Sequence, residues 1–303
     1  MYALVRDRLL AEMESLPTVD CHSHTSLRRD YYAAGPRTLF SLMAYFEREV
    51  QSVTGKGSQQ LYASAKTDRA RWRALKKVIG RARNTSYWRH NLITYRALFG
   101  LEDDELTDGN WQTVNERVKE RTADPEWYDH VTRDVCRLRT QVRNIPWFQD
   151  WEPEYFTAVL RMEEALNLHE RETRERLEKH LGCAIRDLAS AKQALADLVD
   201  EYQERGAVGI KLAHAYGRTL SSEDVPEADA ADIFRRALAD DELGAAEVKA
   251  LQDHIIFFLA ALASKRRLVF QIHTGVQTNW GRISDSDPLH LLPLIHGNRK
   301  TRF

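Results

Sequence analysis

The hydrophobic residues of this 303-residue chain follow two alternating patterns. Apolar positions three or four residues apart predict amphipathic helices, and short apolar runs bounded by polar residues predict buried strands. Helices are expected at residues 2–15, 39–50, 62–79, 87–99, 111–121, 183–204 and 247–263. Strands are expected at residues 17–23, 134–142, 155–161, 207–213 and 267–273. Strands that alternate with helices favour a parallel sheet with right-handed crossovers.

A long segment interrupts this alternation after the first strand. Residues 26–130 contain helical patterns and are rich in Arg, Trp and Tyr. We therefore expect one α/β domain over residues 1–303, of the (β/α)₈ TIM-barrel type, with a helical insertion at 26–130. Such a barrel usually needs about 250 residues. The insertion leaves too little chain for that, so the barrel is expected to be incomplete at its C-terminus.

Composition narrows the class of protein. The formal net charge is −1, so no global field attracts nucleic acid. No apolar run reaches the length of about 18 residues that spans a membrane, and the charged residues near the N-terminus argue against a signal peptide. Cys21, Cys136 and Cys183 are widely spaced and odd in number. They predict no disulfide framework and favour the reducing cytoplasm.

The first predicted strand ends on two histidines. His22 and His24 are one residue apart, and alternate residues of a strand point to the same face. Two imidazoles on one face can chelate a single cation such as zinc. Asp20 precedes them and is more suited to orienting the strand or a ligand histidine. The alternative is a pair of structural histidines that hydrogen-bond at a strand end.

Other strands also end on side chains that carry chemistry. Arg161, Lys211 and His273 stand at the ends of three later predicted strands. Catalytic groups of a TIM barrel cluster at the C-terminal ends of its strands. We therefore expect His273 to be a third metal ligand, and Lys211 and Arg161 to be catalytic. Arg161 and Arg218 are planar donors that can hold an anionic substrate. Pairing of Arg161 with Glu163 and Glu164 is the structural alternative.

Three of these segments together resemble a known family. Asp20-Cys-His22-Ser-His24-Thr25, then Gly209-Ile-Lys211-Leu212, then Gln271-Ile-His273-Thr-Gly275 are similar to strands 1, 4 and 5 of the amidohydrolase superfamily. The resemblance covers residues 16–25 and 155–303, and it is greatest to the amidohydrolase-related metal-dependent hydrolases, near the uronate isomerase branch. It implies a divalent metal, most simply zinc, and hydrolysis of a small, polar, carboxylated substrate by a metal-activated water.

The same resemblance implies elements that the sequence lacks. The family takes further site residues from strand 6, a His, and from strand 8, an Asp. The sequence ends at Lys300-Thr-Arg-Phe303, where strand 6 is expected to begin, so strands 6–8 are expected to be absent. Two further readings stay open: a uronate isomerase-like sugar acid isomerase, and a non-catalytic truncated remnant. A phosphoesterase of the histidinol-phosphatase type also opens with Asp-x-His-x-His, but its later Asp-His motif has no strand-ending counterpart here.

The helical insertion is expected to influence substrate choice. It follows the first strand directly and therefore leaves the barrel at the rim where the metal is expected, a place where loops select substrates. Arg28 and Arg89 are the candidates for binding an anionic group of the substrate. A dimerisation subdomain is the alternative, and we expect a homo-oligomer. The basic run Lys66–Arg83, with Asp68 as its only acid, predicts a solvated or inter-subunit helix face.

Overall fold

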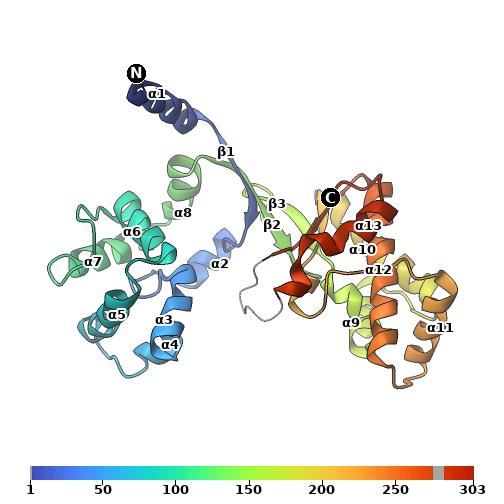
Figure 1. Cartoon of the computed structure of the whole chain (residues 1–303). Coiled ribbons are helices and arrows are strands. Elements are labelled where there is room, and N and C mark those ends of the chain that lie inside the picture. The colour runs from blue at the N-terminus through green and yellow to red at the C-terminus, as the bar shows by residue number, and fades with distance from the viewer. Residues whose placement is uncertain (1, 276–282) are drawn as a thin grey trace. The chain divides into compact units, whose positions relative to one another are not determined.

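The computed structural model describes residues 2–275 and 283–303, and within these the chain divides into two compact units (Figure 1). The helical unit comprises Met1–Thr18 and Ser26–Leu138. The sheet unit comprises Val19–Thr25 and Arg139–Phe303. Among the helices of the described residues, none is both long and apolar enough to cross a lipid bilayer.

The helical unit contains eight α-helices, counted within the residues that the structure describes. They are α1 Tyr2–Ser15, α2 Arg28–Ala33, α3 Glu47–Thr54, α4 Ser58–Tyr62, α5 Asp68–Ala82, α6 Ser86–Phe99, α7 Trp111–Ala123 and α8 Trp127–Asp129. A 3₁₀ turn, η1 Ala44–Phe46, precedes α3, and a π-helical turn, η2 His130–Val135, follows α8. Local signals set the ends of α6, because the Thr85 hydroxyl caps its first turn and Gly100 ends it in the left-handed conformation.

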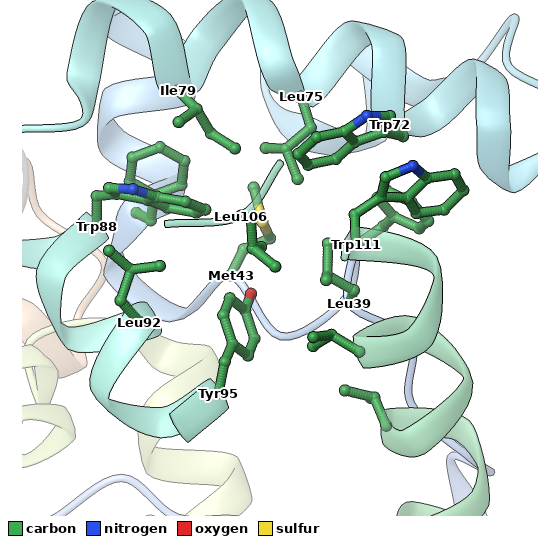
Figure 2. Close-up of a cluster of buried hydrophobic side chains, with 14 of the residues drawn as sticks. Leu39, Met43, Trp72, Leu75, Ile79, Trp88, Leu92, Tyr95, Leu106 and Trp111 are labelled. Carbon is green, nitrogen blue, oxygen red and sulfur yellow. The ribbon is translucent and has the colours of Figure 1, made fainter. Parts of the chain in front are cut away.

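Large aromatic side chains form the core of the helical unit (Figure 2). Trp88 and Tyr95 of α6 are fully buried, and the rings of Trp72 and Trp111 stack with centroids 5.5 Å apart. A buried indole N–H needs an acceptor. The Trp72 indole donates to Asp108 at 2.8 Å, and the Trp88 indole donates to Glu105 at 3.0 Å. The acidic loop after α6 therefore satisfies the polar atoms of an otherwise apolar core.

The sheet unit is built on a curled, all-parallel half-barrel of five strands, consistent with an incomplete TIM-type fold (Figure 1). In sheet order these are β1 Thr18–Ser23, β2 Leu138–Ile145, β3 Phe156–Arg161, β4 Gly209–Leu212 and β5 Val269–Ile272. The described α-helices of the unit are α9 Arg171–Leu181, α10 Leu188–Glu204, α11 Glu227–Leu238, α12 Ala245–Arg266 and α13 Leu292–Gly297. Short 3₁₀ turns are η3 Glu163–Asn167, η4 His214–Tyr216, η5 Ser284–Ser286 and η6 Pro288–Leu291.

Strand register separates an apolar face from a polar one. Leu160, Ile210 and Phe270 are paired across β3, β4 and β5, and each is 1% exposed. The next residue of each strand is Arg161, Lys211 and Gln271, which are paired in turn. Because successive side chains of a strand alternate between faces, these three polar side chains share the opposite face. The helices bury one side of the sheet and leave a polar row on the other.

Close approach of two strands requires a glycine in β4. A Cβ atom at Gly209 would lie 2.6 Å from the backbone oxygen of its partner Val269. Any larger residue would therefore force β4 and β5 apart. Beyond β5, Arg302 forms an isolated parallel bridge with Val269, and its carbonyl accepts a hydrogen bond from the Phe270 amide at 2.8 Å.

Most of the expected elements are present, and the differences have local causes. Strands β1, β3, β4 and β5 lie within or at the expected runs, as do α6, α7, α10 and α12. The second strand was expected at 134–142 but begins only at Leu138, because the preceding residues form the turn η2. The expected helix 39–50 is replaced by η1 and α3. Helix α1 forms as expected, yet its side chains from Leu4 onward are exposed.

The buried aromatic core predicts a large loss of stability in one substitution. Trp88→Ala removes a fully buried indole and the hydrogen bond that it donates to Glu105. We expect the free energy of local unfolding to fall by about 3–5 kcal/mol. Hydrogen exchange of the α6 amides in graded urea measures it. The control is Ile93→Ala on the same helix, because Ile93 is 59% exposed. Equal losses in the two variants would contradict this core assignment.

Candidate functional site

The expected site residues of the sheet unit gather at one edge of the sheet. His22 lies in β1, Arg161 ends β3, Lys211 lies in β4 and His273 directly follows β5. The carboxyl ends of parallel strands meet at the same edge, which is where α/β folds place their ligands. Pairing of Arg161 with Lys211, and a hydrogen bond of 2.9 Å from the His273 amide to the Leu212 carbonyl, fix the order of these side chains.

His22 and His24 point to the same face of β1, as their spacing predicts. Their Nε2 atoms are 3.1 Å apart, and their rings meet edge to face. The intervening Ser23 points the other way, is buried, and donates a hydrogen bond of 3.1 Å to Gln141. Two nitrogens held at about 2.1 Å by one tetrahedral ion lie about 3.4 Å apart. The pair therefore fits two positions on one divalent cation with little movement.

The surroundings of His22 favour its ligating form. Burial lowers the pKa of His22, and the neighbouring Lys211, His24 and His273 lower it further, against the opposing effect of Asp20. Neutral imidazole is the form that binds a metal. The Asp20 carboxylate accepts a hydrogen bond of 3.1 Å from the His22 amide, which fits its expected role in orienting the strand.

His273 is near the pair but does not complete a cluster. It is close enough to affect the pKa of His22, and its ring lies 5.0 Å from that of Tyr216. Across residues 2–275 and 283–303, no three or more His, Cys, Asp or Glu side chains are arranged to hold one metal ion. The two histidines of β1 thus fit part of a coordination shell. Ligation by His273 stays a prediction.

Arg161 and Lys211 form a cationic part of the same edge. Lys211 is only 6% exposed, whereas the Arg161 side chain is 45% exposed. Burial lowers the pKa of Lys211, the charge of Glu163 raises it, and the charge of Arg161 lowers it. Arg161 donates to Glu163 at 3.1 Å, so the pairing considered from the sequence does form. It leaves the guanidinium exposed enough to contact a ligand.

Each of the three arginines expected to bind substrate forms an ion pair within its own unit. Arg218 pairs with Asp253 of α12, which is 1% exposed, and so ties the loop after η4 to that helix. Arg28 donates to Asp129 at 2.9 Å. Arg89 lies 3.2 Å from the carboxylate of Glu105. Substrate contacts by Arg28, Arg89 and Arg218 stay predictions.

Two side chains at this edge had no clear signal in the sequence. Tyr216 contacts His273, and Gln271 lies beside Lys211 in the register. Gln271 lies in β5 and Tyr216 lies four residues after β4, so a search of all polar residues within four positions of a strand end would have included them. His214, in the turn after β4, is buried, and neither of its ring nitrogens has a hydrogen-bond partner among the described residues.

A cleft in the helical unit offers a different surface. It encloses about 1200 Å³, and its lining includes Asp68, Trp72, Lys76 and Asp108. Small-molecule sites are mostly apolar with a few convergent polar groups. Here the indole is buried, and Lys76 lies 2.5 Å from Asp108. This charged surface carries part of the basic run of the sequence, and it lacks the strand-end chemistry of the sheet unit.

Burial of His214 predicts acid sensitivity of the sheet unit. Burial, with the charge of Arg218, lowers the pKa of His214 from 6.5 to about 3. Unfolded chains take up this proton below pH 6.5 while the folded state does not, so stability falls as the pH drops from 6.5 towards 3. Between about pH 7 and 5 we expect His214 to account for a loss of about 2 kcal/mol.

Hydrogen exchange of the β4 and β5 amides at several pH values measures this loss. His214→Leu should flatten the dependence. The exposed His296, replaced in the same way, is the control and should leave the dependence as in the wild type. An unchanged slope in His214→Leu would show that His214 is not held neutral by the fold.

Comparison with solved structures finds several proteins of similar fold. No family model and no curated protein sequence matches the chain. Uronate isomerase from Thermotoga maritima matches with a TM-score of 0.72 and 17% identity, over 88% of this chain and 61% of its own. Glucuronate isomerase from Caulobacter crescentus matches with a TM-score of 0.72 and 15% identity, over 93% of this chain and 66% of its own.

A proposed metal-dependent hydrolase from Lactobacillus casei matches with a TM-score of 0.52 and 17% identity, over 92% of this chain and 63% of its own. The chain therefore spans about two thirds or less of the length of these structures. At such identities the likeness concerns the fold alone. The protein shares the fold of uronate isomerases and of a proposed metal-dependent hydrolase.

Proposed function

We propose that this protein is a metal-dependent enzyme that acts on a small carboxylated substrate, with isomerisation of a sugar acid as its reaction. The observation that carries the proposal is the joint placement of a chelating pair, His22 and His24, with two cations, Arg161 and Lys211, at one edge of the sheet. A metal-binding pair beside two cations suits a substrate with both hydroxyl and carboxylate groups. The likeness in fold to two uronate isomerases supports the same substrate class.

The histidine pair is the proposed metal site. His22 and His24 would hold a divalent ion, for which the sequence favours zinc, and His273 is the expected further ligand. When bound, such an ion polarises a substrate carbonyl or hydroxyl oxygen. The lowered pKa of His22 keeps its ring in the ligating form.

The two cations are proposed to bind and orient the substrate. The Arg161 guanidinium can form paired hydrogen bonds with a carboxylate. Lys211 lies beside it and is nearly buried, so its ammonium group faces little competition from water. Because burial lowers its pKa, Lys211 gives up a proton more readily than a solvated lysine. It is therefore suited to move a proton at an adjacent substrate carbon or oxygen.

Hydrolysis is the second candidate reaction. The sequence itself favours it, and the fold is also similar to that of a proposed metal-dependent hydrolase. A shared fold does not fix the reaction, because the same metal centre can serve isomerisation or hydrolysis. Substrate profiling distinguishes the two reactions.

Metal binding is the first test. Protein purified without chelator should contain about one divalent ion per chain by elemental analysis. The double variant His22→Ala/His24→Ala should lose it, because it removes both imidazoles. The matched control is His290→Ala/His296→Ala, which removes one half-buried and one exposed histidine outside the strand ends. Unchanged metal content in the first double variant would refute the site.

Substrate binding and turnover form the second test. Metal-loaded protein is titrated with D-glucuronate by calorimetry, and ketose formation is followed by ¹³C NMR. Arg161→Met should weaken binding by about 1.5–3 kcal/mol, roughly ten- to a hundredfold, because one charge-assisted contact is lost. The control is Arg235→Met, since Arg235 pairs on the surface with Asp232.

The same preparation is offered lactones, esters and N-acyl amino acids. If these compounds are cleaved and no ketose forms from glucuronate, the reaction is hydrolysis and the proposed isomerisation is wrong. Wild-type affinity in Arg161→Met would remove Arg161 from the substrate site.

A further inference from the structure

Glu163 contacts one cation of the candidate site, Arg161, and lies close enough to the other, Lys211, to raise its pKa. It is the first residue of η3, directly after β3, and only Met162 separates it from Arg161. One oxygen of its carboxylate, Oε2, accepts the hydrogen bond of 3.1 Å from the Arg161 Nε. The other oxygen, Oε1, is shielded from solvent and has no hydrogen-bond partner among the described residues. One oxygen of the Glu163 carboxylate is thus shielded from water and receives no hydrogen bond from the described residues.

Lys211 is held against the same turn. It is the register partner of Arg161, and its carbonyl accepts a hydrogen bond of 2.9 Å from the amide of Met162. The backbone that leads into Glu163 is therefore bonded to the backbone of Lys211. Lys211 is 6% exposed, and the charge of Glu163 acts on it in the direction that favours the ammonium form.

Electrostatics favours a carboxylate close to both Arg161 and Lys211. Arg161 and Lys211 are direct neighbours on adjacent strands. Their like charges repel, and burial penalises the ammonium group further. A shielded carboxylate oxygen without a donor is also unfavourable. A contact from the Lys211 ammonium to the free oxygen of Glu163 would relieve all three penalties.

We propose that Glu163 is a positioning residue that joins Arg161 and Lys211 into one clamp, with Oε2 holding the guanidinium and Oε1 facing the ammonium group. The clamp then carries a net single positive charge, which matches one substrate carboxylate. This inference deepens the proposed function and rests on it for the identity of the ligand. The clamp itself rests only on the contacts around Glu163.

The chain supplies a matched control on the same turn. Glu164 is the next residue, and its carboxylate lies 2.7 Å from Arg176 of α9 rather than at the clamp. Glu163→Gln and Glu164→Gln both remove one negative charge and keep the shape of the side chain. Circular dichroism melts of both variants establish that they fold.

The first readout is the reactivity of Lys211 itself. Protein is treated with acetic anhydride at a series of pH values, and acetylation of Lys211 is measured by peptide mass spectrometry against the exposed Lys66. In Glu163→Gln we expect Lys211 to react about three- to tenfold faster below its pKa, the change in neutral amine produced by a pKa shift of about half to one unit. Glu164→Gln should match the wild type within twofold. A folded Glu163→Gln protein with wild-type reactivity of Lys211 would overturn the clamp.

The second readout is D-glucuronate binding by calorimetry. Glu163→Gln should weaken D-glucuronate binding about tenfold, in line with a lost charge-assisted contact. As the pH is raised, the variant should lose binding at a lower pH than the wild type. In a Lys211→Met background the same substitution should have a smaller effect, because part of its action passes through Lys211. Full additivity of the two substitutions would also overturn the clamp. Altered Lys211 reactivity in a protein that binds no glucuronate would support the clamp and count against the proposed function.

Discussion

The parallel register of β3, β4 and β5 is the constraint on which the rest of the candidate site depends. It makes Arg161, Lys211 and Gln271 neighbours on one face, while Leu160, Ile210 and Phe270 are buried on the other. The apolar side of the sheet thus fixes the position of its polar side. Once the helices cover the first face, two cations must lie together at the carboxyl ends of the strands. The carboxylate of Glu163 and the solvent exposure of the Arg161 side chain reduce the repulsion between the two cations.

Stability and chemistry are divided between the two units. The helical unit has a core of stacked and edge-packed aromatic rings, and carboxylates from one acidic loop satisfy two buried indole N–H groups. The sheet unit holds the histidine pair, both strand-end cations and His273. These groups all belong to one compact unit, so the contacts within that unit set their geometry. The roles proposed for Arg28 and Arg89 require the helical unit as well.

The fold permits more than one reaction, so the function must be argued from the side chains. Uronate isomerases and a proposed metal-dependent hydrolase share this fold. A chelating histidine pair would serve either reaction, since both need a polarised oxygen. The neighbouring cations are the more specific feature. A nearly buried lysine beside an arginine suits the binding of a carboxylate and the transfer of a proton, which together favour a sugar acid over a neutral amide.

Local patterns in the sequence predicted the features that depend on local physics. Alternation along a strand placed His22 and His24 on one face, and helical spacing located most helices. Contacts between distant segments were decided by the tertiary structure. Strand register placed Lys211 beside Arg161, and packing placed Arg218 in an ion pair with Asp253. Burial left both ring nitrogens of His214 without a hydrogen-bond partner among the residues that the structure describes. No local pattern encodes these, because each depends on how segments many residues apart pair and pack.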